Sequence, residues 1–193
     1  MEYDILPAVR SDAPAILALQ RLAYQSEALR YNDWTLPPLT QPLEALEAEF
    51  KRLVILKAVP HAAQTTAAEP ASKPAHAYAL GAPGLETQPS TPSVVGSVRA
   101  GLSHGTCHIG RLIVHPEHQR QGLGSALLAA IETRFPAAER FSLFTGARSA
   151  GNIGLYQRHG YQVVRSQEMT PEMTLVFLEK PGPAAKDHSK AED

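Results

Sequence analysis

The chain has 193 residues, enough for one domain with a substantial apolar core, and 44% of them are hydrophobic. A formal net charge of −1 gives no reason to expect nucleic acid as a partner, and no apolar run approaches the roughly 18 residues of a membrane helix. The acidic start is unlike a secretory signal, and the single cysteine, Cys107, excludes an internal disulfide. We therefore expect a cytoplasmic protein, or a nuclear one.

The N-terminal third predicts a strand, two helices and a second strand. Pro14 is expected in the first turn of the first helix, where its missing N–H costs nothing, and apolar residues from Ile16 to Ala23 recur at helical spacing. The expected elements are a strand over Asp4–Arg10, a loop over Asn32–Thr40, a helix over Leu43–Phe50 and a strand over Leu53–Val59.

The segment Pro60–Pro92 differs in composition from the rest. It is rich in Ala, Pro, Thr, Ser and Gln and has no apolar periodicity, which is typical of chain that cannot bury enough surface to order itself. We expect a single domain over residues 1–180 with a mobile loop inserted at 60–92, followed by a disordered tail over 181–193.

The C-terminal half alternates strands and helices. The expected strands are Val94–Gly101, Thr106–Val114, Phe141–Thr145, Tyr161–Arg165 and Thr174–Leu178, and the expected helices are Leu123–Phe135 and one capped by Ser149 and Asn152. The full order, β-α-α-β-β-β-α-β-α-β-β, predicts an α/β fold with helices on both faces of a mixed sheet.

A turn rich in glycine and cationic residues joins the strand that ends at Val114 to the next helix. Gly122 and Gly124 carry no Cβ, so a ligand can approach the backbone closely there. The first amides of the helix have no intrahelical partner and lie at the positive end of the helix dipole, and Arg120 adds a full charge. We expect this turn to bind a pyrophosphate.

Three kinds of phosphate-binding turn could give this pattern. A P-loop requires a Lys that is absent, and a dinucleotide-binding turn requires a third Gly and an acid at the end of the next strand, both absent. The remaining pattern, Gln/Arg-x-x-Gly-x-Gly/Ala, resembles the acetyl-CoA motif of the GNAT superfamily of N-acetyltransferases, and the chain matches it with Gln119-Arg120-Gln121-Gly122-Leu123-Gly124. An ordinary Gly-rich turn into an amphipathic helix would give the same hexapeptide.

A second motif strengthens the resemblance. Asn152, Tyr156 and the pair Gly160-Tyr161 have the spacing of the second GNAT signature. The resemblance is specific over residues 94–180, looser over 1–58, and absent from 60–92 and beyond 180. It implies a GNAT fold, with a mixed, mostly antiparallel sheet of six to seven strands that splays at its centre, flanked by about four helices. It also implies an N-acetyltransferase with acetyl-CoA as cosubstrate and no metal.

The resemblance assigns most of the candidate residues to the cofactor. The strand end would bind the pantetheine arm through its backbone, and an N–H near Val114 would donate to the oxyanion of the tetrahedral intermediate. The cofactor-binding residues implied are Leu112, Ile113, Val114, Gln119, Arg120, Gln121, Gly122, Leu123, Gly124, Ser125 and Asn152.

Two residues are candidates for proton transfer. Tyr156 occupies the position of the general acid, because a phenol is protonated at neutral pH and can protonate the leaving thiolate; a core tyrosine is the alternative. Several GNAT enzymes have a Glu four residues before the cofactor-binding end of the strand, where this chain has His108, the candidate base. Glu27 and Asp33 are candidates for binding the amine, and Arg111 is expected to face solvent or a carboxylate.

Other chemistries are weaker alternatives. A nucleophilic Cys107 would need an activated thiol, and His115 and His118 lack the further ligands of a closed zinc site. Transfer of another acyl group, a CoA-binding regulatory domain and a dinucleotide-dependent oxidoreductase are the remaining rivals. The acceptor, a small-molecule amine or a protein N-terminus or lysine, is expected to be selected by the loops at 24–42 and 166–173. Neither nucleic acid nor membrane is expected as a partner, and a monomer or homodimer is expected.

Overall fold

The computed structural model describes residues 3–61 and 94–185 of the chain. Most of the predicted inserted loop over 60–92 and of the predicted tail over 181–193 lies outside these residues.

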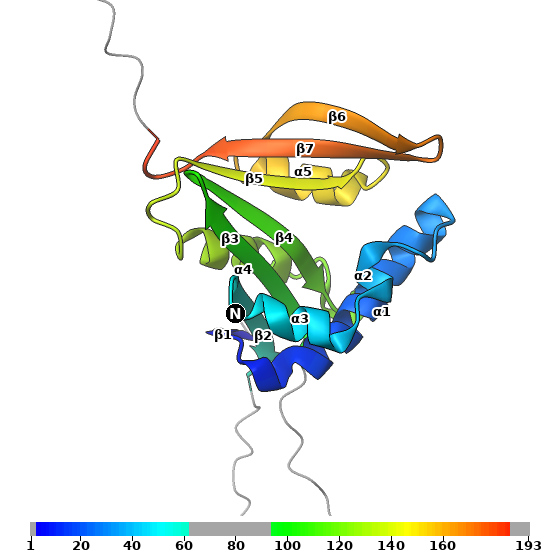
Figure 1. Ribbon diagram of the computed structural model, residues 1–193, viewed down its shortest axis with the longest axis horizontal. Helices are drawn as coiled ribbons and strands as arrows, with labels where there is room; N and C mark the ends of the chain where they lie inside the picture. The colour runs from blue at the N-terminus through cyan, green and yellow to red at the C-terminus, as the bar shows by residue number, and fades with distance from the viewer. Residues whose placement is uncertain (1–2, 62–93, 186–193) are drawn as a thin grey trace, which may run out of the picture.

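A single seven-stranded sheet forms the centre of the described structure (Figure 1). Its strand order is β1-β2-β3-β4-β5-β7-β6, and the neighbouring strands are antiparallel except for the parallel pair β4 and β5. This agrees with the mixed, mostly antiparallel sheet expected from the sequence. The strands are β1 Tyr3–Pro7, β2 Val54–Pro60, β3 Gly96–Ser103, β4 Thr106–Val114, β5 Arg140–Gly146, β6 Gln162–Thr170 and β7 Met173–Pro181.

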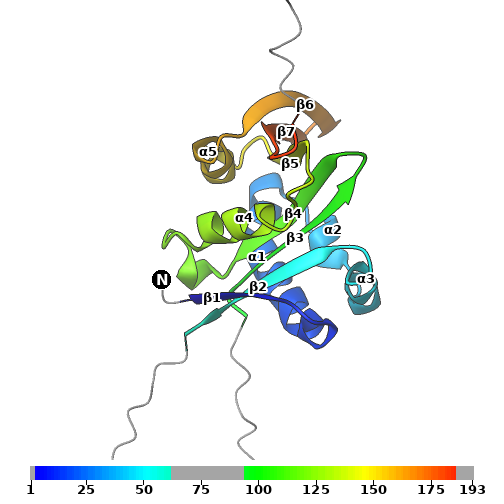
Figure 2. The ribbon, with the colours of Figure 1, turned by 90° about the vertical axis from the view of Figure 1, so that its left-hand side faces the viewer.

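Helices cover both faces of the sheet (Figure 2). On one face, α4 and α5 pack against the strands around Leu127, which is fully buried; on the other, α1 and α3 enclose a second core around Leu46. The helices within the described residues are α1 Ala13–Tyr31, α2 Pro37–Thr40, α3 Leu43–Glu49, α4 Leu123–Glu132 and α5 Ala150–Arg158.

The expected loop over Asn32–Thr40 is wrong in part, because it contains the short helix α2. Pro37 and Pro38 begin the helix rather than preventing it, since proline is compatible with a first helical turn. The buried Gln20 of α1 fixes α2 in place by donating from Nε2 to the carbonyl oxygen of Pro38 at 2.8 Å. This tertiary contact has no local sequence signal.

Strands β4 and β5 separate soon after they begin. Their pairing is confined to Thr106–His108 of β4 and Arg140–Ser142 of β5, and the two strands then diverge (Figure 1). The splay expected at the centre of the sheet is therefore present between these strands.

A bulge in β4 lies within the diverging part. The register with β3 shifts between Ser97 and Arg99, and Arg111 has a φ of 51°. The extra residue reverses the side-chain alternation: Ile109 packs in the α4 core before the bulge, whereas Ile113 packs in the α1–α3 core after it. The bulge thus decides which face receives each side chain at the strand end.

Candidate functional site

The end of β4 offers free backbone. Beyond His108 the strand no longer pairs with β5, and the side chains there belong to the cores: Ile113 is 4% exposed, and Leu112 and Val114 pack against the α4 core. The backbone of these three residues is available to a ligand, and the side chains of Leu112 and Val114 are partly exposed. Its N–H and C=O groups on the β5 side can pair with an extended amide, as another strand would.

The turn after β4 presents a group of unpaired amides. Ala126 N–H donates to the Gly122 carbonyl at 3.0 Å, whereas the N–H groups of Leu123, Gly124 and Ser125 donate to nothing in the described part of the chain. Gly122 has a φ of 85° and free space around its Cβ position, so its backbone conformation is what requires glycine. These amides make the N-terminal end of α4 a suitable site for a phosphate.

Side chains of the turn form hydrogen bonds that hold it in place. Gln121 accepts a 2.6 Å hydrogen bond from the Tyr3 hydroxyl of β1 and donates to the Glu117 carbonyl at 3.0 Å. The ring of His118 lies 2.9 Å from the same hydroxyl, and Gln119 donates to the Val114 carbonyl at 3.2 Å. These contacts tie the turn to β1 and β4. No local pattern predicts the contact with Tyr3, because the two segments lie more than a hundred residues apart.

Arg120 differs from these residues. Its side chain is exposed and makes no hydrogen bond or ion pair within residues 3–61 and 94–185. Its positive charge is therefore free to meet an anion beside the unpaired amides of α4.

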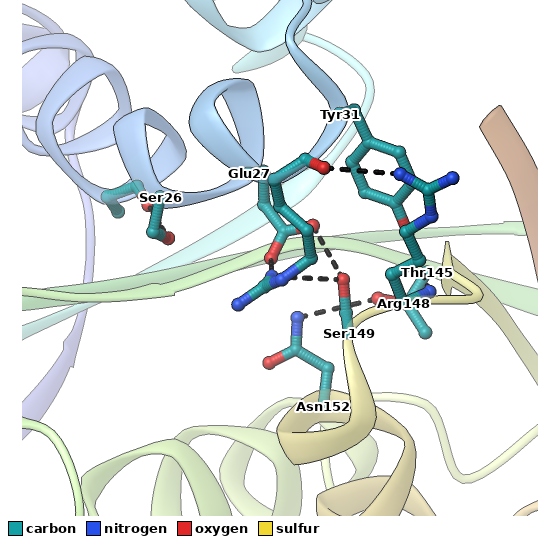
Figure 3. A network of polar contacts seen from close by, with 9 residues as sticks. Ser26, Glu27, Tyr31, Thr145, Arg148, Ser149 and Asn152 are labelled. Carbon is teal, nitrogen blue, oxygen red and sulfur yellow. Dashed lines mark hydrogen bonds and ion pairs between the residues drawn. The ribbon is translucent and has the colours of Figure 1, made fainter. Parts of the chain in front are cut away.

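A polar network joins α1 to the loop between β5 and α5 (Figure 3). The hydroxyl of Ser149 donates to Glu27 Oε2 at 2.5 Å, and Glu27 also forms an ion pair with Arg30. Next to it, the Arg148 N–H donates to the Tyr31 hydroxyl at 2.8 Å. Ser149 was expected to cap α5 with its side chain; it occupies the N-cap position, but its hydroxyl bonds to the carboxylate of α1 instead. A bond to a charged acceptor is stronger than one to a backbone amide.

Asn152 lies at the same end of α5. Its Nδ2 donates to Thr145 Oγ1 of β5 at 3.4 Å, so it contacts the strand end rather than capping the helix (Figure 3). The helix is further placed by Leu155, whose side chain would lie 3.5 Å from a Cβ built on Gly124. The middle of α5 is therefore adjacent to the first turn of α4.

Tyr156 and Tyr161 are both buried but differ in their hydroxyls. Tyr161 donates to Glu132 Oε1 at 2.7 Å and is a core residue. Tyr156, 7% exposed, makes no hydrogen bond within the described residues. Burial raises the pKa of Tyr156, and the nearby Tyr24 and Glu27 raise it further. Its hydroxyl therefore stays protonated through the neutral range and is free to donate to a ligand.

The structure brings Glu27, Asn152 and Tyr156 together. It places His108 and Asp33, the other candidates for proton transfer and amine binding, elsewhere. His108 is the last β4 residue paired with β5, and its exposed side chain lines a separate open hollow with Ser142, Phe144 and Phe177. Asp33 accepts hydrogen bonds from Thr35 N at 2.7 Å and Oγ1 at 2.6 Å, which lower the pKa of Asp33 and fix the turn before α2.

Two neighbouring arginines, Arg99 and Arg111, lie on the α1 side of the sheet, and the sequence did not predict that they lie together. Arg99 of β3 forms an ion pair with Glu49 of α3. Burial lowers the pKa of Arg99 to about 10; Glu49 opposes this effect, and the positive charge of Arg111 adds to it. Arg111 lies with its guanidinium carbon 5.6 Å from the centre of the Tyr24 ring. It is partly exposed and has no acidic partner within the described residues, so the expected carboxylate is not found there.

The described structure does not favour a nucleophilic cysteine or a metal site. Cys107 is fully buried, and burial raises the pKa of its thiol to about 12, which leaves no reactive thiolate. In the described part of the chain no group of three or more His, Cys, Asp or Glu side chains gathers as metal ligands would. None of the helices in residues 3–61 and 94–185 is long and apolar enough to cross a membrane.

Comparison with known proteins agrees with this geometry. Residues 90–163 match the family described as the acetyltransferase (GNAT) domain. Residues 90–163 therefore resemble a GNAT domain. The matched residues include both motifs, the Gly-rich turn at 119–124 and the signature at 152–161. No curated protein matches the chain.

Solved structures extend the likeness in fold to nearly the whole chain. The ribosomal-protein-S18-alanine N-acetyltransferase of Escherichia coli is 15% identical with a TM-score of 0.64, over 96% of this chain and 97% of that one. The PaiA N-acetyltransferase of Thermoplasma acidophilum, solved with coenzyme A, is 14% identical with a TM-score of 0.63, over 94% and 99%. YncA of Salmonella typhimurium, solved with acetyl-CoA, is 19% identical with a TM-score of 0.63, over 100% and 99%. At these identities the likeness shows the fold.

The close approach of Gly146 to Tyr31 provides a test of the network between α1 and β5. A Cβ on Gly146 would lie 2.2 Å from the Tyr31 hydroxyl and 2.7 Å from its ring. We predict that Gly146→Ala displaces Tyr31 and lowers the free energy of unfolding by about 1–3 kcal/mol. Gly151 of α5 has open space at its Cβ position, so Gly151→Ala is the matched control and should be neutral or stabilising. Equal urea midpoints for the two variants would contradict the close packing.

Proposed function

We propose that the protein is an acetyl-CoA-dependent N-acetyltransferase that transfers the acetyl group to a primary amine by direct attack in a ternary complex. The observation that carries this proposal is the diverging end of β4, with its free backbone, leading directly into the unpaired amides of α4. The family of residues 90–163 and the fold support the same chemistry.

The residues present fit acetyl-CoA, which would supply the acetyl thioester. In this proposal Arg120 and the amides of residues 121–125 bind the pyrophosphate, with Gln119 and Gln121 holding the turn in shape. The backbone of Leu112, Ile113 and Val114 pairs with the amides of the pantetheine arm. Asn152 and Leu155 border the same arm from α5.

The reaction forms a C–N bond and breaks the C–S bond of the thioester. A backbone N–H near Val114 donates to the carbonyl oxygen as it gains charge. Tyr156 donates its hydroxyl proton to the departing sulfur, a role that its free hydroxyl supports. The amine gives up a proton to a base, and two residues compete for that role: His108, from its position on the strand, and Glu27, from its place beside Tyr156.

Two rivals remain for experiment to separate. Another acyl-CoA would bind the same turn, and a CoA-binding regulatory domain would keep the binding residues without turnover. The free Tyr156 hydroxyl favours turnover. The E. coli neighbour acts on a ribosomal protein by its name, so protein N-termini belong in the acceptor screen beside small amines and lysines. The acceptor loops would come from residues 24–42 and 166–173.

Binding of acetyl-CoA should stabilise the protein. At about 100 times the dissociation constant the gain is roughly 2.7 kcal/mol, which a melting curve detects easily. We predict that Arg120→Ala weakens binding by about 10-fold, because a charged contact with phosphate is lost, and leaves the free protein unchanged. Arg134→Ala, an exposed arginine beyond the far end of α4, is the control. A melting temperature unmoved by saturating acetyl-CoA would rule out the proposed function.

Tyr156→Phe should lower turnover by about 100-fold, the scale of general acid catalysis, while acetyl-CoA affinity stays the same because only a hydroxyl is lost. Since the pKa of Tyr156 is raised, the wild-type rate should show no basic limb from this phenol near its ordinary value of about 10. Tyr161→Phe is the matched control: it removes a hydroxyl bonded to Glu132 and should affect stability but not the chemical step. Near wild-type turnover in Tyr156→Phe would exclude the acid role.

The base can be assigned from the dependence of kcat/KM on pH. A base works only when deprotonated, so activity falls as the pH drops through its pKa and gives an acidic limb. If His108 is the base, His108→Ala removes this limb and Glu27→Gln leaves it in place. The opposite pattern assigns the role to Glu27. A limb that survives in both variants at the position set by the free amine would show that the amine loses its proton to water.

A further inference from the structure

On the α1 side of the sheet, one of two neighbouring arginines has no acidic partner within the described residues. Of the two neighbouring arginines, Arg99 forms the ion pair with Glu49 and also donates to Gln41 Oε1 at 3.3 Å. Arg111 has neither an ion pair nor a hydrogen bond within residues 3–61 and 94–185. The Nε atom of Arg111 is buried and has no hydrogen-bond acceptor in the described part of the chain. A buried guanidinium N–H of this kind requires an acceptor that the described chain does not supply.

The bulge in β4 explains why Arg111 lies there. The residue has a φ of 51°, so its side chain leaves the regular alternation of the strand and reaches α1. The guanidinium lies 5.6 Å from the centre of the Tyr24 ring, an attractive arrangement that leaves its N–H donors free. A non-glycine residue in the left-handed region is uncommon and marks this position as unusual in the strand.

Tyr24 connects this charge to the candidate active site. It is a neighbour of Arg111 and also lies close enough to Tyr156 to add to the effect of burial on the Tyr156 pKa. The acidic side chain in this region, Glu27, is already matched by Arg30. The charge of Arg111 therefore lies beside Tyr24 on the α1 side of the sheet, and Tyr24 in turn lies near Tyr156.

We propose that the acceptor is an amine that also carries a carboxylate, and that Arg111 binds this carboxylate while the amine reaches the thioester. This proposal rests on the proposed acetyltransferase function. The planar fork of a guanidinium donates to both oxygens of a carboxylate, and such a ligand would satisfy the buried Nε. Arg148, which stacks on the Tyr31 ring at 5.7 Å, adds a second positive charge at the end of α1.

The test compares amines that differ only in the carboxylate. Glycine, β-alanine and the common α-amino acids are each assayed beside their carboxamides, and kcat/KM is measured from thiol release with saturating acetyl-CoA. We expect the carboxylate member of the best pair to be preferred by about 10-fold or more, mainly through KM. Arg111→Gln should abolish the preference and Arg111→Lys should keep part of it, while the KM for acetyl-CoA stays the same.

A matched control and a second readout keep the outcome clear. Arg10→Gln removes an exposed arginine that pairs with Glu47 and should leave the preference unchanged. Calorimetry with N-acetylated amino acids and N-acetylated amino amides, in the presence of CoA, measures the same discrimination without turnover. Equal or weaker binding and turnover of the carboxylates, or a preference that persists in Arg111→Gln, would overturn the proposal. Wild-type protein that binds acetyl-CoA and acetylates the carboxamides equally well would overturn this inference alone and leave the acetyltransferase intact.

Discussion

The separation of β4 from β5 is the constraint on which the rest of the candidate site depends. Once the parallel pairing ends at His108 and Ser142, the backbone of β4 has neighbours on one side only. Unpaired backbone is costly when it is buried, so the structure tolerates this edge only where water or a ligand can reach it. A linear ligand that carries amides can replace the missing strand, which is the form of the pantetheine arm.

The bulge at Arg111 makes this separation compatible with two hydrophobic cores. Without the extra residue, Ile113 and Ile109 would point to the same face of the sheet, and one of the two cores would lose a side chain. With it, the end of β4 contributes Ile113 to the α1–α3 core and Leu112 and Val114 to the α4 core. Packing of apolar side chains therefore holds a strand end whose own backbone hydrogen bonds are incomplete.

Local patterns in the sequence were sufficient for much of the fold, including the turn between β4 and α4. Strand β4 was predicted with its exact bounds, and the start of α4 at Leu123 follows from Gly122 and the apolar periodicity. Features that depend on distant contacts were missed. Glu49 and Arg99 lie fifty residues apart in the chain, and the hydroxyl of Ser149 was diverted from its helix by Glu27, more than a hundred residues away. Neither contact has a signal within a window of ten or twenty residues.

The two sides of the candidate site differ in how fully their polar groups are satisfied. Glu27, Ser149 and Arg30 satisfy one another, as do Tyr161 and Glu132, and such closed groups stabilise the packing of elements. The Nε of Arg111 is left open, which costs about 1–3 kcal/mol for a buried donor without a partner. A ligand that accepts a hydrogen bond from this Nε would remove the cost. The first amides of α4, the edge of β4 beyond His108 and the Nε of Arg111 are thus three backbone or side-chain donors without a partner in the described part of the chain.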